Sequence, residues 1–407
     1  MTPLRVNFGK TRGTLETLDD WLSYQENLHT KEIDLGLERV QKIYQKLFPQ
    51  GMPFKVITVA GTNGKGSTIA FIDNIYQQAN IKVAKFTSPH ILRYNERFVI
   101  NGVQASDKKI CTAFKTIEQA RGNTALTYFE FSTLAALLIF TNEKVDIAVL
   151  EIGLGGRLDS VNVVDSNVGV ITNIELDHID YLGNTREKIG LEKSGIMRKN
   201  IPCICGDSNP PSAIAQYAKH CGALLSFVNT PYLGKIGLSG EHQKTNAALA
   251  IAAVNKLQSV FSVNQNQHAQ GIEKTKLSAR FQVKTIQDKT VILDVAHNAA
   301  AVQTLTDELK KNKQPTIAIF SALQDKDIKS MIDIVTPLID EWLLPPLQVN
   351  RAIAMQDLTQ KFSLSSKIKV CNDMSSAIHQ AFNAKQVRRI VIFGSFHIVA
   401  DALKVLE

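Results

Sequence analysis

The first two thirds of the chain alternates between short apolar runs and segments of helical period. Runs rich in β-branched residues, which we predict as strands, lie at 55–60, 82–87, 145–153 and 167–174. Between the first two runs, residues 67–80 place apolar side chains along one face of a helix. Near-continuous apolar strands separated by helices predict a parallel sheet that is covered on both faces.

The same alternation restarts near residue 290 and continues to the end of the chain. Five further strands are predicted at 290–296, 316–323, 341–347, 368–373 and 388–396. Helices are predicted between and after them, at 300–312, 375–384 and 398–407. The pattern breaks near 277–284, so we divide the chain into domains at 1–281 and 282–407. The predicted fold class is α/β, with a larger N-terminal P-loop-type domain and a smaller Rossmann-like C-terminal domain.

Length and composition agree with a two-domain α/β protein and indicate its cellular compartment. The 407 residues favour at least two domains, and 44% hydrophobic with 21% charged residues is ordinary for a globular protein. Residues 1–20 lack the apolar stretch of a secretory signal. The apolar run at 134–140 is far shorter than the roughly 18 residues of a membrane helix. We expect a cytoplasmic protein without a membrane partner.

Cysteine spacing and charge bear on the ligands to expect. The cysteines number five and show no C-x-x-C spacing, which favours buried thiols over disulfides or a zinc site. The net charge of +8 comes from scattered lysines, without a basic stripe interleaved with aromatic residues. Nucleic acid is therefore not expected as a partner, and small anionic ligands suit such a field.

The sequence VAGTNGKGST at 59–68 follows the first predicted strand and opens the first predicted helix. It differs from the usual phosphate-binding pattern G-x-x-x-x-G-K-[ST], because Gly66 stands between Lys65 and Ser67. Its three glycines allow a tight turn whose N–H groups point at an anion, and the helix adds its positive dipole end. With Lys65 as a positive charge, we predict that this loop binds nucleotide phosphates.

Polar sequence also follows the other three strands of the first group, in SPH, EIGLGGRLDS and NIELDHID. If these strands are parallel neighbours, their carboxyl ends converge on one crevice. There the carboxylate of Glu151 suits Mg²⁺, and the hydroxyl of Ser88 is a further oxygen ligand. Imidazole suits Mn²⁺ better than Mg²⁺, so His178 is open to three interpretations: general base, structural histidine or metal ligand.

Together these segments are similar to the folylpolyglutamate synthase/dihydrofolate synthase family, relatives of the Mur-type ATP-dependent amide ligases. The likeness covers nearly the whole chain and is nearest to the bacterial bifunctional members. It rests on WLSYQENLHTKEIDLGLERV, AGTNGKGST, TSPHILRYNERF, LTYFEF, LEIGLGGRLDSVN, LDHIDYLG, EKSGI, GEHQKTNAA, ARFQ, LDVAHN and GSFHIVA, in that order. One departure is Ser278-Ala279 before Arg280, where members often have proline and glycine.

The resemblance implies a role for individual residues. ATP contacts would come from Thr62, Asn63, Gly64, Lys65, Gly66, Ser67, Asn246, Arg280, Asp294 and His297. The metal ligands would be Ser88, Glu151, His178 and Lys193, the last as a carbamate. Dihydropteroate would contact Ile33, Asp34, Leu35, Thr127, Tyr128, Phe129, Glu130, Leu158, Asp159 and Ser160. The catalytic candidates are Lys65, Lys193 and His178.

The activity implied is that of a bifunctional ligase. It would join L-glutamate to dihydropteroate and to reduced folyl-glutamates through an acyl phosphate, using ATP and two Mg²⁺ ions, with Mn²⁺ as a possible substitute. A monomer is expected. The alternatives are a single one of the two activities, a muropeptide ligase, a small-molecule kinase and a non-enzymatic nucleotide-binding module. A muropeptide ligase usually carries an additional N-terminal domain, whereas about 50 residues precede the first predicted strand here.

Overall fold

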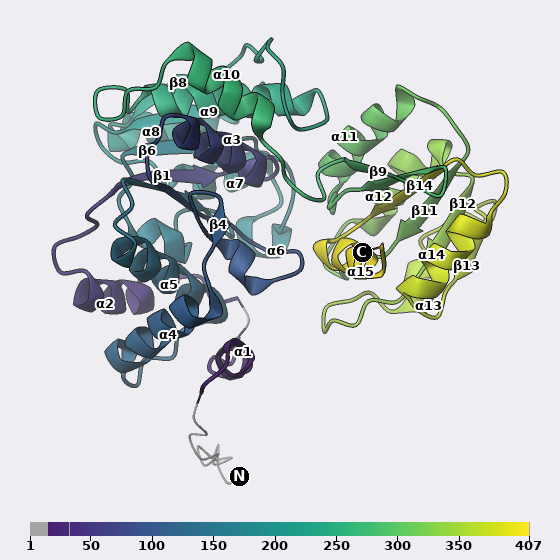
Figure 1. Ribbon diagram of the computed structural model, residues 1–407, viewed down its shortest axis with the longest axis horizontal. Coiled ribbons are helices and arrows are strands. Elements are labelled where there is room, and N and C mark those ends of the chain that lie inside the picture. The colour runs from purple at the N-terminus through teal and green to yellow at the C-terminus, as the bar shows by residue number, and fades with distance from the viewer. Residues whose placement is uncertain (1–14, 32, 407) are drawn as a thin grey trace, which may run out of the picture.

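The computed structural model describes residues 15–31 and 33–406, which form two α/β units (Figure 1). The absence of a secretory signal was predicted from residues 1–20, and most of these lie outside the described residues. Within them, strands assemble into one eight-stranded and one six-stranded sheet, each covered by helices. The predicted α/β fold class is confirmed.

The larger sheet has the strand order β4-β3-β2-β5-β1-β6-β7-β8 and is parallel from β2 to β8. Among the described residues of this sheet, the antiparallel pairs are β2 with β3 and β3 with β4. The bounds are β1 (Lys55–Ala60), β2 (Val83–Phe86), β3 (Phe98–Ile100), β4 (Val103–Gln104), β5 (Ile147–Glu151), β6 (Val168–Ile171), β7 (Pro202–Cys205) and β8 (Leu224–Phe227). The strands predicted in the first group are β1, β2, β5 and β6, and they are parallel neighbours as the crevice requires.

Register brings the ends of the central strands level. Val59 of β1 lies opposite Glu151 of β5 on one side and Val170 of β6 on the other. Alternate residues of β1 enter different cores, with Val56 on one face and Ile57 on the other. The loops after these strands therefore start from a rigid, doubly covered sheet.

Helices cover both faces of the larger sheet. One face carries α3 (Lys65–Gln78), α9 (His242–Asn255) and α10 (Gln265–Lys274). The other carries α1 (Leu18–Glu26), α2 (Glu38–Leu47), α4 (Asp107–Arg121), α5 (Tyr128–Asn142), α7 (Arg186–Ser194) and α8 (Ser212–Cys221). The short α6 (Ile179–Leu182) lies at the side of the larger unit nearest the smaller one in Figure 1. Helix α5 is apolar all round and mostly buried, and Thr127 caps it by accepting from the Glu130 N–H.

The smaller sheet has the order β13-β12-β11-β14-β10-β9, with β9 antiparallel to β10 and the other pairs parallel. Its strands are β9 (Gln282–Ile286), β10 (Lys289–Leu293), β11 (Thr316–Phe320), β12 (Glu341–Leu344), β13 (Ile368–Val370) and β14 (Arg389–Phe393). Its helices are α11 (Ala299–Lys310), α12 (Ile328–Val335), α13 (Met355–Thr359), α14 (Met374–Asn383) and α15 (Phe396–Leu406). The five strands predicted here are present, and β9 is an additional edge strand.

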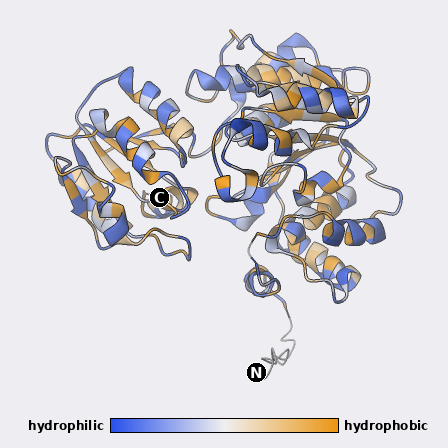
Figure 2. Ribbon diagram, turned by 180° about the vertical axis from the view of Figure 1, so that it is seen from behind, coloured by the Kyte–Doolittle hydropathy of each residue, from blue (hydrophilic) through white to orange (hydrophobic). Residues whose placement is uncertain are grey.

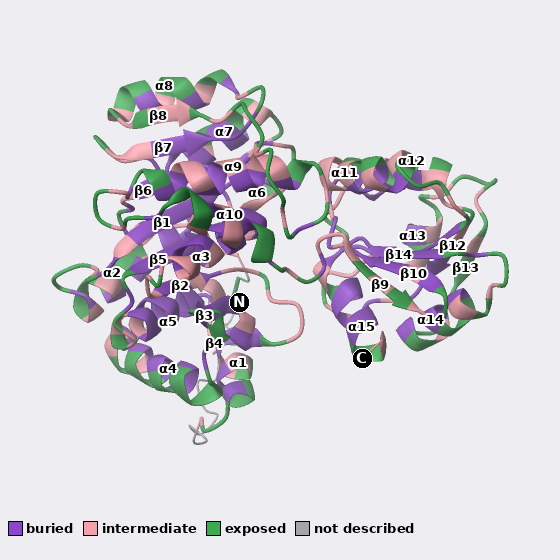
Figure 3. Cartoon of the chain, turned by 45° about the horizontal axis from the view of Figure 1, so that its top comes forward, coloured by how far each residue is buried: buried purple, intermediate pink, exposed green. Residues whose placement is uncertain are grey.

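Short 3-10 helices complete the secondary structure, at η1 (Tyr94–Arg97), η2 (Ser160–Val163) and η3 (Thr336–Leu338). Apolar residues concentrate on the strands and on the inner sides of the helices, as Figure 2 shows by hydropathy. Figure 3 shows that the central strands of both sheets are buried, whereas edge strands such as β8 and β9 are half-buried or exposed. The five cysteines are free thiols, four of them buried and Cys221 half-buried. Across 15–31 and 33–406, no helix combines the length and apolar character needed to cross a membrane.

Candidate active site

Two adjoining cavities lie at the carboxyl ends of the larger sheet. The interdomain cavity, of about 190 Å³, is lined by the loop after β1, the end of β5, α6, α7 and residues of the smaller unit. The side cavity, of about 230 Å³, lies in the larger unit between the loop before α2, the start of α5 and the turn after β5. The residues that line both cavities are Ser88, Pro89, Gly153, Leu154 and His178.

The glycine loop between β1 and α3 borders the interdomain cavity. Gly61 and Gly64 have φ angles of +144° and +83°. A Cβ on Gly61 would lie 1.8 Å from Thr172 Oγ1, and one on Gly64 would lie 2.6 Å from Asn246 Oδ1. At Gly66 a Cβ would meet nothing nearer than 3.7 Å. The first two positions therefore need glycine because the backbone passes close to neighbouring side chains in the left-handed region.

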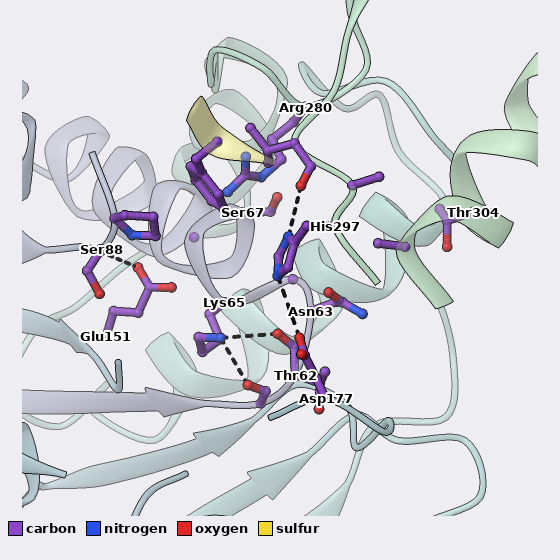
Figure 4. Close-up of a pocket in the computed structure, with 18 of the residues that line it drawn as sticks. Thr62, Asn63, Lys65, Ser67, Ser88, Glu151, Asp177, Arg280, His297 and Thr304 are labelled. Carbon is purple, nitrogen blue, oxygen red and sulfur yellow. Dashed lines mark hydrogen bonds and ion pairs between the residues drawn. The ribbon is translucent and has the colours of Figure 1, made fainter. Parts of the chain in front are cut away.

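Lys65 begins α3 and folds its ammonium group back over this loop (Figure 4). Its Nζ donates to the carbonyl oxygens of Gly61 at 3.0 Å and Thr62 at 3.1 Å. Burial lowers the pKa of Lys65, while the nearby carboxylates of Glu151 and Asp177 act in the opposite direction. A cation thus lies within the glycine loop, next to the space where phosphates were predicted.

Other loop residues are tied to the segment after β6. Thr62 Oγ1 donates to the carbonyl of Glu175 at 3.2 Å, and the N–H of Asn63 donates to Asn173 Oδ1 at 2.8 Å. Asn246, on α9, lies against Gly64 and is not one of the described residues lining the interdomain cavity. The remaining residues predicted for ATP all line that cavity.

Glu151, Ser88 and His178 come together from three different strand ends. Glu151 is 5% exposed and accepts from the Ser88 N–H at 3.0 Å. Burial raises the pKa of Glu151, against the opposing charge of Lys65. His178 has a φ of +50°, and its buried Nδ1 has no hydrogen-bond partner in the described chain. Burial lowers the pKa of His178 to about 4, although Asp177 opposes the shift, so the ring is neutral and available as a ligand.

Lys193 lies on α7, is 4% exposed and lines the interdomain cavity. Burial lowers the pKa of Lys193 to about 7, and the positive charge of Lys65 adds to the effect. Gly156 lets the turn after β5 pass close to α7, since a Cβ there would lie 3.0 Å from the Lys193 Cα. A neutral amine is therefore accessible at Lys193 near physiological pH.

Three further predicted residues line the same cavity: Arg280 just before the smaller unit, and Asp294 and His297 within it. The Arg280 guanidinium lies over the Phe396 ring, 5.1 Å from its centroid. Burial lowers the pKa of Arg280, whereas Asp294 and Glu151 raise it. Asp294 accepts from two backbone N–H groups at 2.7 and 2.8 Å, and burial raises its pKa. His297 Nδ1 lies 2.9 Å from the carbonyl two residues earlier. These side chains face the glycine loop across the cavity, as Figure 4 shows for Arg280 and His297.

The side cavity gathers nine of the ten residues predicted for dihydropteroate. They are Ile33, Asp34, Leu35, Thr127, Phe129, Glu130, Leu158, Asp159 and Ser160. Tyr128 is not among the lining residues of the described chain. Its ring packs edge-on against Tyr94 at a centroid distance of 5.7 Å, and burial raises the pKa of Tyr128 to about 12.

The acidic side chains of the side cavity each have partners. Asp159 accepts from two backbone N–H groups at 2.8 and 2.9 Å. Burial raises the pKa of Asp159 to about 7, although these N–H groups act against the shift. Arg39 forms ion pairs with Asp34 at 2.7 Å and with Glu130 at 3.2 Å. The loop that carries Asp34 is thereby joined to the start of α5.

Asp177 is the centre of a cluster that the sequence analysis did not identify. Asp177 accepts from Lys326 Nζ at 2.6 Å and from Asn298 Nδ2 at 3.0 Å, and lies 3.6 Å from His297 Nε2. Asn298 also exchanges two hydrogen bonds with Asn63 of the glycine loop, at 3.1 and 3.2 Å. Burial alone would raise the pKa of Asp177, but hydrogen bonding and these positive charges hold it well below its usual range. The cluster joins the two units across the interdomain cavity.

Two family models match the chain. Residues 59–203 match the Mur ligase middle domain, and residues 279–396 match the Mur ligase, glutamate ligase domain. The first covers the strands from β1 to the start of β7, and the second begins just before β9.

Close relatives match over nearly the full length. The chain is 38% identical to a dihydrofolate synthase/folylpolyglutamate synthase of Escherichia coli (strain K12), over 98% of this chain and 97% of the relative. It superposes on the structure of E. coli FolC in complex with DHPP and ADP with a TM-score of 0.90 and 37% identity, covering 96% and 98% of the two chains. A bifunctional folylpolyglutamate synthase/dihydrofolate synthase with Mn, AMPPNP and L-glutamate bound gives a TM-score of 0.86 and 36% identity, covering 96% and 98%.

Proposed function

The chain belongs to the dihydrofolate synthase/folylpolyglutamate synthase family, and on this premise we propose that it is an ATP-dependent amide ligase with both activities. It joins L-glutamate to dihydropteroate and to folyl-glutamates. The observation that carries this proposal is the adjacency of the two cavities. A folate-type acid in the side cavity and a nucleotide tail at the glycine loop meet at the shared wall formed by Ser88, Gly153 and His178.

ATP is proposed to bind in the interdomain cavity. The N–H groups of the glycine loop and the dipole of α3 attract its phosphates, and Lys65 supplies a charge for the terminal one. Asp294 and His297 contact the nucleotide from the smaller unit, and Arg280 contacts it from the segment just before that unit. The proposed division is thus an ATP- and pterin-binding domain at 1–281 and a glutamate-ligase domain at 282–407, acting as a monomer.

The donor set at the shared wall and beside it, in the interdomain cavity, fits a hard divalent cation. Glu151 offers a carboxylate, Ser88 a hydroxyl, and His178 a neutral ring whose Nδ1 lacks a partner in the described chain. Residues 15–31 and 33–406 contain no ready-made cage of three or more His, Cys, Asp or Glu side chains. Such a sparse set suits Mg²⁺, which keeps waters and takes phosphate oxygens, with Mn²⁺ able to replace it. When bound, the ion neutralises charge that develops on the transferring phosphoryl group.

Lys193 is proposed to supply ligands for a second ion after carbamylation. Its neutral amine attacks CO₂, a C–N bond forms, and the nitrogen releases a proton, which leaves a carboxylate-like group. The depressed pKa of Lys193 makes the neutral amine available for this step. Burial of the side chain protects the product from water.

The reaction proceeds in two displacements. An oxygen of the substrate carboxylate attacks the γ-phosphorus of ATP, so that an acyl phosphate forms and ADP leaves. The glutamate amine then attacks the acyl carbon, loses a proton and expels inorganic phosphate, and the amide bond remains. Lys65 and the loop N–H groups stabilise charge during the first displacement. Closure of the two units excludes water from the acyl phosphate.

The test is ADP release by purified protein with dihydropteroate and tetrahydrofolate supplied separately. Release is expected with each acid, and only when L-glutamate and a divalent cation are also present. Release with one acid alone would establish the single-activity alternative. ATP hydrolysis without any dependence on glutamate would refute the proposal.

A further inference from the structure

Arg97 is a buried cation in the wall of the side cavity. It ends the 3-10 helix η1, is 7% exposed, and lines the cavity beside Ser88 and Thr127. Its backbone is fixed, because the N–H of Thr87 donates to the Arg97 carbonyl at 3.2 Å. The side chain is thus held where a ligand in this cavity would meet it.

The guanidinium of Arg97 is only partly satisfied by its surroundings. Its Nε donates to His90 Nδ1 at 3.0 Å, and its plane lies near the rings of Tyr94 and Tyr128, with centroids at 5.4 and 5.6 Å. Within the described chain, no carboxylate forms an ion pair with Arg97. Aromatic rings and an imidazole acceptor compensate a buried cation less well than an anion does.

The other charged side chains of this cavity already have partners. Arg39 pairs with both Asp34 and Glu130, and backbone N–H groups hold Asp159. Among the lining residues of the described chain, Arg97 is the one lysine or arginine. The cavity therefore offers carboxylates and backbone groups at some points and, at another, a cation that opposes the rise in pKa that burial causes at the nearby Glu151 but forms no ion pair within the described chain.

We propose that Arg97 binds the carboxylate of the folate-type substrate. The inference rests on the proposed function, which places an organic acid in the side cavity. A guanidinium presents a planar fork of N–H donors that matches a carboxylate. Within residues 15–31 and 33–406, the side-chain hydrogen bond of Arg97 comes from Nε, which leaves the terminal nitrogens for a bidentate contact. The carboxylate is that of the benzoate in dihydropteroate, or one on the glutamyl part of a folate. The dihydropteroate and the folate thus both present a carboxylate to Arg97, whereas the pterin ring is uncharged.

The test compares acid and amide ligands on wild-type protein and Arg97→Gln. Dihydropteroate is paired with its primary carboxamide, and tetrahydrofolate with its α-amide and its γ-amide, in the presence of a non-transferable ATP analogue. Binding is measured by isothermal titration calorimetry. Loss of a charge-assisted contact is expected to weaken acid binding about 10- to 100-fold in Arg97→Gln, while amide binding changes less than about twofold. For one acid and its amide, Arg97→Gln should no longer bind the acid more tightly than the amide. That pair identifies the carboxylate that Arg97 binds.

Two further variants separate this role from a structural one. Arg97→Lys keeps a positive charge and is expected to retain part of the preference for the acid. Arg93→Gln is the matched control, because Arg93 directly precedes η1 and its side chain is 65% exposed. Equal weakening of acid and amide by Arg97→Gln would overturn the inference and leave the proposed function intact. If the wild-type protein bound neither dihydropteroate nor tetrahydrofolate, the proposed function itself would be refuted.

Discussion

Replacing Asp177 by asparagine is expected to weaken closure of the two units. Asp177 belongs to the larger unit, whereas Lys326, Asn298 and His297 belong to the smaller one. The side chains of Asp177 and Lys326 are 8% and 5% exposed. The substitution removes the carboxylate 2.6 Å from the buried ammonium group and leaves it the more distant carboxylate of Asp325, at 3.7 Å. Removing one partner of a buried pair costs about 3–5 kcal/mol.

Separation of the two units would return Lys326 to water, so this cost acts mainly on the closing equilibrium. A shift of about 3 kcal/mol corresponds to roughly a hundredfold change in the closed population. Because the proposed reaction needs closure to exclude water, kcat/KM is expected to fall by up to this factor. The melting temperature should change little, since the buried residues of the two units form separate clusters and the contact between them comes from half-buried side chains such as Ile91 and Leu92.

The assay combines steady-state ADP release with small-angle X-ray scattering in the presence of a nucleotide analogue. Asp177→Asn should enlarge the radius of gyration, and adding Lys326→Met should recover part of the activity by removing the buried charge that has lost its nearer carboxylate. Asp165→Asn is the control, because it breaks an ion pair with Arg198 in which the Asp165 side chain is 83% exposed. An unchanged radius and rate in Asp177→Asn would refute this reasoning.

Three further substitutions test the site. Gly64→Ala places a Cβ at a residue with φ +83°, 2.6 Å from Asn246 Oδ1. The Kd for ADP, measured by calorimetry, should therefore rise about tenfold or more. An unchanged Kd would contradict the assignment of this loop to phosphate binding. Lys193→Ala should lower kcat at least about a hundredfold with partial rescue by acetate, and full unrescued activity would dismiss the carbamate. Glu151→Gln should abolish the stimulation of activity by divalent cations. The melting temperature without metal should not fall, because burial raises the pKa of the Glu151 carboxyl and thus disfavours its charged form. A clearly lower melting temperature would count against this account.

Much of the fold follows from apolar periodicity alone. The runs that became β1, β5 and β6 are continuous and β-branched because both sheet faces are covered, and that pattern is unambiguous in a sequence. Their polar endings predicted one crevice, and the structure brings Lys65, Glu151 and His178 together there. The roles of these residues remain predictions.

What could not be predicted has physical causes. Strand β9 was missed because it is a half-exposed edge strand with Val283 51% exposed. The turn after β9 has Gln287 and Asp288 at φ +49° and +63° without the usual Asn-Gly signal. The contact between Asp177 and Lys326 spans 149 positions, and no periodicity connects such residues. Tyr128 shares its segment with lining residues, but its position on α5 turns the ring toward Tyr94.

The central claim is that a substrate carboxylate attacks the γ-phosphate of ATP. The most direct measurement supplies dihydropteroate labelled with ¹⁸O in its carboxylate, together with ATP and L-glutamate, and analyses the inorganic phosphate by mass spectrometry. The account predicts that each phosphate released carries one ¹⁸O atom from the acid. Unlabelled phosphate, or label found in AMP, would contradict it.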